Sequence, residues 1–103
     1  MGGGPLLSFW VVRRERGGPW DWSRGLREQD GFEEHARFMD GLVDDGFVVL
    51  GGPLADERWV QLVVEAPSEE AVHHRLAGDN WTQDGKLVTR SVEGWNVLLD
   101  GRR

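Results

Sequence analysis

The chain has 103 residues, the size of one domain, and twelve basic against eighteen acidic residues give it a formal net charge of −6. A net negative charge disfavours binding to the phosphates of nucleic acids. Cysteine is absent, which excludes disulfides, thiolate metal ligands and a thiol nucleophile. The sequence contains no signal-peptide pattern and no apolar run of the roughly 20 residues that a membrane span needs, so we expect a cytoplasmic protein.

The charges are unevenly distributed along the chain. Residues 1–27 contain five arginines against two acidic residues, whereas residues 28–79 contain thirteen acidic residues against three arginines. The basic segment is compatible with an anionic small ligand. Arginines are more often solvated, however, and this is the interpretation that we favour for Arg13, Arg14, Arg16, Arg24 and Arg27.

The first third of the chain predicts a tail, a strand and a loop. The glycine-rich residues 1–5 are expected to form a flexible tail, and residues 6–100 the domain. Aromatic and β-branched residues predict a strand over residues 6–14. The stretch 15–29 contains Gly, Pro and charged residues without any period, which predicts a loop.

A helix and a short strand follow this loop. Asp30 and Glu33 have the spacing of a capping box, which predicts a helix that begins there and continues to about Asp45. Gly46 is expected to end the helix, because glycine readily adopts the left-handed conformation found at many helix ends. Residues 47–50 then predict the second strand.

The second half of the chain predicts a second helix among further strands. The segments are, in order, a strand over residues 59–65, a helix over residues 68–77 with Ser68 as its N-cap, a loop over residues 78–85, and strand-forming stretches over residues 87–92 and 95–99 that are interrupted at Glu93-Gly94. The complete order is therefore β-α-β-β-α-β with an additional strand or strand extension at the end.

This order predicts an α+β fold, the ferredoxin-like βαββαβ sandwich. Right-handed crossovers place both helices on one face of an antiparallel sheet. The first strand is apolar on both sides, with Phe9 and Val11 on one and Trp10 and Val12 on the other. Because an uncovered second face would expose a large apolar patch, we expect two copies to pack these faces together as a homodimer.

His35 lies within the apolar stripe of the first predicted helix. On a helical wheel it falls between Met39 and Leu42, whereas the charged residues of the helix lie outside this arc. An imidazole that faces inward needs a partner for at least one ring nitrogen. From this position alone, a histidine that is hydrogen-bonded within the core is the simpler interpretation.

Two segments of the sequence resemble motifs of the YCII-related domain family. The first is His35-Ala-Arg-Phe-Met-Asp-Gly-Leu-Val-Asp-Asp-Gly-Phe-Val-Val-Leu-Gly-Gly-Pro-Leu, and the second is Leu76-Ala-Gly-Asp-Asn-Trp. The resemblance extends from the first strand to Trp95. It implies the fold of the dimeric α+β barrels, whose members include isomerases, lyases and monooxygenases acting on small oxygenated or aromatic compounds.

The resemblance also implies a pair of site residues. In the family, a histidine on the first helix is paired with an aspartate after the second, which corresponds here to His35 and Asp79. Relatives often have a proline after this aspartate, whereas this chain has Asn80, so the turn departs from the family pattern while the carboxylate is kept.

Such a pair is suited to acid–base chemistry. A carboxylate that accepts a hydrogen bond from one imidazole nitrogen fixes the tautomer and leaves the other nitrogen available as base or acid. The function expected from His35 and Asp79 is therefore that of a cofactor-independent lyase or isomerase acting on a small oxygenated or aromatic metabolite. The alternative is a non-catalytic ligand-binding or dimerisation module in which the pair is structural.

Other residues are candidates for the walls of a ligand pocket. Gly52 and Pro53 follow the second strand, where they form either a backbone wall beside His35 or only a tight turn. Trp20, Trp22 and Trp81 lie in predicted loops and are candidates for stacking on a flat ligand. The sequence has no phosphate-binding loop, no His-x-x-x-His and no nucleophile elbow, so we expect a small-molecule ligand but no metal ion and no cofactor.

Overall fold

The computed structural model describes residues 7–102 and contains one antiparallel sheet with the strand order β2-β3-β1-β4. The expected flexible tail, residues 1–5, lies outside the described residues. The strands are β1 (Ser8–Arg16), β2 (Val48–Pro53), β3 (Trp59–Ala66) and β4 (Leu87–Trp95). The helical elements are the 3-10 turn η1 (Leu26–Glu28) and the helices α1 (Phe32–Asp44), α2 (Glu69–Leu76) and α3 (Asn80–Gln83).

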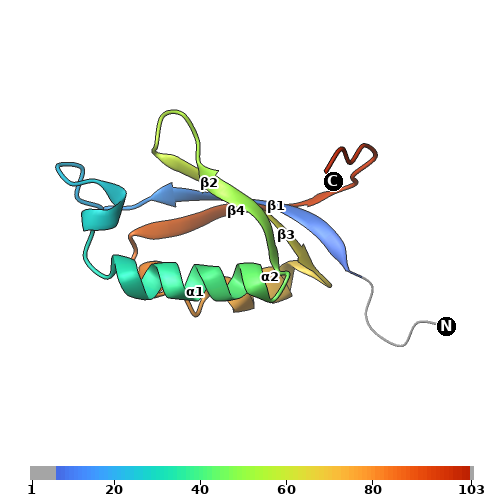
Figure 1. Cartoon of the computed structure of the whole chain (residues 1–103), viewed down its shortest axis with the longest axis horizontal. Coiled ribbons are helices and arrows are strands. Elements are labelled where there is room, and N and C mark those ends of the chain that lie inside the picture. Colours follow the sequence, from blue (N-terminus) through green and yellow to red (C-terminus); the bar gives the residue numbers. More distant parts are fainter. Residues whose placement is uncertain (1–6, 103) are drawn as a thin grey trace.

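Both longer helices, α1 and α2, lie on the same side of the sheet, as Figure 1 shows. All neighbouring strands pair antiparallel, with β1 and β3 in the centre of the sheet. The order of the elements along the chain and the order of the strands agree with the ferredoxin-like α+β fold that the sequence predicts. Within residues 7–102, no helix has the length and apolar character needed to cross a membrane.

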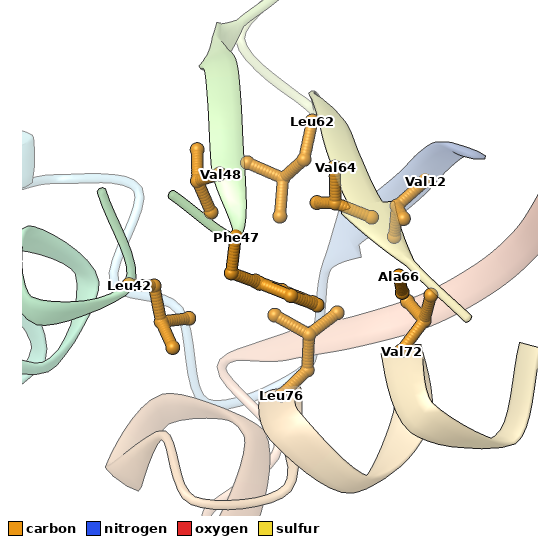
Figure 2. Close-up of a cluster of buried hydrophobic side chains, with 9 residues drawn as sticks. All are labelled: Val12, Leu42, Phe47, Val48, Leu62, Val64, Ala66, Val72 and Leu76. Carbon is orange, nitrogen blue, oxygen red and sulfur yellow. The ribbon is translucent and has the colours of Figure 1, made fainter. Parts of the chain in front are cut away.

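The main core fills the space between the sheet and these two helices. Alternate residues of the central strands point toward the helices, because side chains on a strand alternate between its faces. Phe47, which follows α1, projects between Leu42 of α1 and Leu76 of α2 (Figure 2). The buried side chains of this cluster are Val12, Leu42, Phe47, Val48, Leu62, Val64, Ala66, Val72 and Leu76 (Figure 2).

The two ends of α1 differ in how well the sequence predicted them. The predicted capping box is wrong, because the N-cap is Gly31 with φ of 79°, and no side chain caps the helix. Asp30 instead accepts a hydrogen bond from Arg24 at 3.3 Å. At the other end, Gly46 has φ of 80° and its N–H bonds to the carbonyl of Val43, which confirms the predicted glycine stop.

Two strand predictions are corrected by the pairing of β1 with β4. β1 continues past the predicted end at Arg14 to Arg16, which pairs with Leu87. The predicted interruption at Glu93-Gly94 is wrong, because both residues pair with β1 and belong to one continuous strand. A glycine is tolerated inside this strand because its neighbours on β1 hold it in the ladder.

The predicted strand over residues 95–99 is wrong beyond its first residue. Trp95 pairs with Phe9, next to the first residue of β1, so the chain that follows has no strand to pair with. Residues 96–99 have no regular structure. Farther along the chain, the guanidinium of Arg102 lies 5.8 Å from the centre of the Phe9 ring.

A short helix, α3, occupies part of the predicted loop over residues 78–85, and the prediction of a continuous loop is therefore wrong. Asp79 is its N-cap, and the Asp79 side chain accepts a hydrogen bond from the backbone N–H of Trp81 at 3.1 Å. Aspartate is among the strongest N-cap residues, so a helical turn is favoured at this place.

The second face of the sheet carries apolar side chains, and neither α1 nor α2 covers it (Figure 1). The pairing register places Phe9, Val11, Val63 and Trp95 on this face. Trp10 points the other way and packs against the main core. This second face is the surface that the sequence analysis assigns to a homodimer contact.

Candidate functional site

The structure brings His35 and Asp79 into direct contact. His35 lies in the first turn of α1, and Asp79 caps α3 just after α2. Nδ1 of His35 lies 2.7 Å from Oδ1 of Asp79, which is hydrogen-bond distance. The Asp79 side chain is fully buried, whereas the His35 side chain retains 13% exposure. The imidazole therefore lies between a buried carboxylate and solvent-accessible space.

Arg14 of β1 completes this group, although the sequence analysis interpreted it as solvated. Its two η nitrogens each lie 3.3 Å from Oδ2 of Asp79, and Nη2 also bonds to the hydroxyl of Thr82. Both oxygens of the carboxylate are thus occupied, one by His35 and the other by Arg14. The signal available in the sequence was position, because Val12, Arg14 and Arg16 alternate along one strand and share the face that the helices cover.

The surroundings keep Asp79 ionised. Burial by itself raises the pKa of Asp79, but the hydrogen bond from His35, the N–H of Trp81 and the charge of Arg14 outweigh that effect, so the pKa lies below the ordinary value of an aspartate. An ionised carboxylate only accepts hydrogen bonds, so Nδ1 of His35 must be the nitrogen that donates. In the neutral ring, Nε2 then carries the lone pair, and Nε2 makes no hydrogen bond within residues 7–102.

Trp81 fixes the plane of the imidazole. The rings of His35 and Trp81 are stacked, with centroids 4.0 Å apart and planes at 11°. Trp81 is itself 1% exposed, and its indole N–H bonds to the carbonyl of Asp30 at 2.9 Å. Trp20 meets Trp81 edge-on at 5.3 Å. A buried indole anchored at both its ring and its N–H leaves the imidazole little freedom to tilt.

A cavity of about 420 Å³ lies beside this group. Its lining is largely apolar and comes from all four strands, from α1, and from Trp20, Leu26 and Trp81. The lining residues are Arg14, Arg16, Trp20, Leu26, His35, Met39, Asp40, Val43, Val48, Val49, Leu50, Gly51, Gly52, Pro53, Val60, Leu62, Trp81 and Leu87. Cavities of this size with few polar groups are typical of small-molecule sites.

Of the five residues that the sequence predicts for the pocket walls, four line the cavity and one does not. Gly52, Pro53, Trp20 and Trp81 line the cavity, and their part in ligand binding stays a prediction. Trp22 does not line it: this residue is 56% exposed, and its ring lies edge-on to Trp20 at a centroid distance of 6.3 Å. Within residues 7–102, no three His, Asp or Glu side chains are arranged as ligands for a metal ion.

Sequence analysis missed several of the residues that surround His35. Met39 and Val43 follow it on one side of α1 and both line the cavity; Met39 also packs against the main core, whereas Val43 is 53% exposed. Of the apolar stripe on α1, Leu42 alone is fully buried, while Phe38 and Met39 are half-buried against the core. The helical wheel identifies which side of α1 is apolar, but it does not separate the part that contacts the sheet from the part that faces a cavity.

No family model matches the chain, and no curated protein matches it significantly. Among solved structures, the chain is similar to the 5-chloro-2-hydroxyhydroquinone dehydrochlorinase TftG of Burkholderia phenoliruptrix AC1100, in complex with 2,5-dihydroxybenzoquinone. The two sequences are 23% identical, the TM-score is 0.62, and the match covers 88% of this chain and 94% of that chain. At this identity the likeness establishes the fold alone: the chain shares the fold of that dehydrochlorinase.

Proposed function

We propose that this chain is a YCII-like protein that binds a small molecule and acts on it, without a cofactor, as an acid–base enzyme of the lyase or isomerase class. The observation that carries the proposal is the placement of His35. Its ring lines a cavity of about 420 Å³, its Nδ1 is bonded to a buried carboxylate, and its Nε2 has no hydrogen-bond partner within residues 7–102. This is the arrangement that a general base requires.

Nε2 of His35 is the proton acceptor in this proposal. It takes a proton from a hydroxyl or an acidic carbon of the bound molecule, and the electron pair of the broken bond moves into the adjoining conjugated system. In a lyase, that electron pair expels an anionic leaving group, and the imidazolium returns its proton to solvent. In an isomerase, Nε2–H gives the proton back at a second carbon. Asp79 stabilises the imidazolium between the two steps.

The walls of the cavity support a flat, oxygenated or aromatic substrate. The indoles of Trp20 and Trp81 provide rigid apolar surface, and apolar side chains from α1 and β2 enclose the rest. The enzyme of similar fold removes chloride from a hydroxylated ring, as its name states, and its structure holds a quinone. A ring bearing hydroxyl or carbonyl groups is therefore the substrate class that we propose for this cavity.

A structural role for the pair is the second candidate function. The observation that favours it is the number of bonds that Asp79 makes to the fold: Arg14 of β1, the N–H of Trp81 and His35 of α1 all meet this one carboxylate. In that case the protein is a ligand-binding or dimerisation module, and His35 does no chemistry.

Turnover by a variant at His35 distinguishes the two candidates. Hydroxylated aromatic compounds, quinones and lactones are first screened by their effect on the melting temperature of the protein. Compounds that raise it are then incubated with protein in deuterated buffer, and proton NMR follows deuterium incorporation or loss of a leaving group. We expect His35→Gln to abolish the reaction while compound binding persists. His74→Gln, a change at an exposed histidine of α2, is the matched control.

The outcomes are separable. Reaction rates that are the same in His35→Gln and in the unaltered protein would refute the catalytic role of His35. Binding without any reaction, in a protein whose stability depends on His35, would favour the structural module.

We further propose that the protein works as a cytoplasmic homodimer whose contact is the second face of the sheet. The support is the set of apolar side chains that the register places on that face, Phe9, Val11, Val63 and Trp95, of which Trp95 is 46% exposed. Face-to-face packing of two sheets would cover these side chains on both copies.

A further inference from the structure

Arg16, the last residue of β1, is a buried cation with a hydrogen-bond donor that no described residue accepts. Its side chain is 4% exposed and lines the same cavity as His35. The Nε atom of Arg16 is completely buried and has no hydrogen-bond partner within residues 7–102. Buried polar groups are normally hydrogen-bonded, and a charged group without partners is the more costly case. The burial of Arg16 without a partner for Nε therefore suggests that a bound molecule supplies the missing contact.

Glu57, the acidic residue that forms an ion pair with Arg16, does not meet this need. Oε1 of Glu57 lies 3.7 Å from Nη1 of Arg16, which is too long for a hydrogen bond. The Glu57 side chain is 69% exposed and belongs to the connection between β2 and β3. An ion pair with so exposed a partner contributes little, because water screens it.

Trp20 holds the guanidinium of Arg16 in place without using its donors. The central carbon of the guanidinium lies 4.0 Å from the centre of the Trp20 ring, a cation–π contact. A guanidinium placed over an aromatic face does not spend its N–H groups on that contact, so they stay available as donors. Arg16 is therefore a pre-oriented donor in the wall of a cavity.

The charged residues that line the cavity differ in how well their charges are paired. Arg14 is also buried, but Asp79 neutralises it through two hydrogen bonds. Asp40, an acidic residue of the lining, is solvent-exposed on α1. The lining thus contains Arg14, whose charge Asp79 neutralises, the imidazole of His35, and Arg16, whose charge is paired only with the exposed Glu57 among the described residues.

We propose that Arg16 binds an anionic oxygen of the ligand, a carboxylate or an ionised ring hydroxyl, and so makes this cavity selective for planar acids over neutral rings of the same shape. The inference deepens the proposed function by naming the charge of its substrate class. A guanidinium presents two parallel N–H groups, which match the two oxygens of a carboxylate. The ligand oxygen supplies the hydrogen bonds that Glu57 is too distant to accept.

The experiment compares matched pairs of acid and amide. Isothermal titration calorimetry near neutral pH measures binding of benzoate, salicylate and gentisate, and of benzamide, salicylamide and gentisamide, which keep the shape and lose the charge. We expect the unaltered protein to bind at least one acid about tenfold to a hundredfold more tightly than its amide, the size of a charge-assisted hydrogen bond. Equal affinity within every pair would overturn the proposal without any variant.

Two variants assign the preference to Arg16. Arg16→Met keeps apolar contact with Trp20 and removes the charge, so the acid should bind as weakly as the amide, while affinity for the amide is unchanged. Arg16→Lys keeps the charge but not the planar fork, and should restore part of the preference. Arg37→Met, which removes an exposed arginine from α1, is the matched control and should change neither affinity. A preference that survives in Arg16→Met overturns the proposal.

A variant at Glu57 tests the same site in the opposite direction. Glu57 has φ of 60°, a conformation that asparagine tolerates better than most residues, so Glu57→Asn keeps the turn and removes the competing carboxylate. We expect it to bind the acids more tightly than the unaltered protein does. Failure of every acid and amide to bind at millimolar concentration would contradict both the pocket of the proposed function and the role of Arg16. Binding of amides and acids alike would contradict only the latter.

Discussion

Arg14 and Asp79 form an ion pair that is almost completely excluded from solvent, directly beneath His35. Their side chains are 1% and 0% exposed, and both η nitrogens of Arg14 lie 3.3 Å from one carboxylate oxygen. A buried pair adds little net stability, since desolvation of the two charges offsets their attraction. The pair instead fixes the position of the carboxylate. Arg14 binds Oδ2 of Asp79, so Oδ1 faces Nδ1 of His35 in one orientation.

Removing the charge of Asp79 should destabilise the protein strongly. Asp79→Asn leaves Arg14 buried without a counter-charge, and breaking one side of a buried pair costs about 3–5 kcal/mol. In a domain of this size, that loss lowers the melting temperature by more than about 10 °C. Thermal unfolding followed by circular dichroism measures it.

The control for this variant is Asp45→Asn. Asp45 forms an ion pair with Arg75 at 2.8 Å, but the pair is at the surface, so its loss should change stability by less than about 1 kcal/mol. Equal losses of stability in the two variants would contradict the view that burial makes the loss of one partner of the Arg14–Asp79 pair costly.

His35→Leu should be tolerated far better than Asp79→Asn. The carboxylate of Asp79 keeps two partners after the change, Arg14 and the N–H of Trp81, so it is not left unpaired. A leucine on the stacked face of Trp81 also replaces the lost ring contact with apolar contact. We expect a change in unfolding free energy of less than about 1.5 kcal/mol, measured by urea titration. A loss of 3 kcal/mol or more, on the order of that for a broken buried pair, would instead favour the structural role.

The folded protein should lose stability in acid partly through Asp79. Because the pKa of Asp79 is lower in the folded chain than in the unfolded one, its contribution is fully present above the unfolded pKa, near 4, and is lost as the pH falls through the folded value. Urea unfolding at a series of pH values between about 6 and 2.5 should therefore show a shallower acid decline for Asp79→Asn than for the unaltered protein. Sucrose added to both samples keeps the variant folded. If the unfolding free energies of the two proteins fell in parallel with decreasing pH, the lowered pKa of Asp79 would be contradicted.

Gly31 and Gly46 should differ in their tolerance of a side chain. Both have positive φ, so Gly→Ala introduces backbone strain of about 1 kcal/mol at either site. A Cβ at Gly46 meets open space, whereas one at Gly31 would lie 2.7 Å from Nδ2 of Asn80 and 3.3 Å from Nε1 of Trp81. We expect Gly31→Ala to lower the melting temperature clearly more than Gly46→Ala. The opposite ranking would be inconsistent with the contact between α1 and α3.

A charge placed on the second face of the sheet should dissociate the proposed dimer. Val11 lies on the central strand β1, opposite Val63 of β3. Sedimentation velocity at micromolar concentration should give twice 11.6 kDa for the unaltered chain and the monomer mass for Val11→Glu. Arg37→Gln on the exposed side of α1 changes the net charge equally and should remain dimeric. A monomeric unaltered protein would refute the dimer.

The order of the elements and the inward position of His35 could be predicted from the sequence, because both depend on local patterns. Alternating apolar residues predict the strands, and a helical wheel places His35 in the apolar arc of α1. The glycine at position 46 predicts the end of that helix, where it adopts φ of 80°. The start of the same helix was not predictable in this way. Gly31 there lies against Asn80, which is far away in the sequence, and this contact replaces the expected cap at Asp30.

Only the tertiary structure decided which charges are buried and what they hold. Three arginines lie close together on β1, and they differ in burial. Arg13 is exposed, whereas Arg14 and Arg16 are buried on the face that the helices cover. Their burial depends on Asp79 and Trp20, which reach β1 from distant segments. A local pattern records which face of a strand a residue occupies. Whether a charged residue on that face finds a partner depends on contacts that form when the helices pack on the sheet.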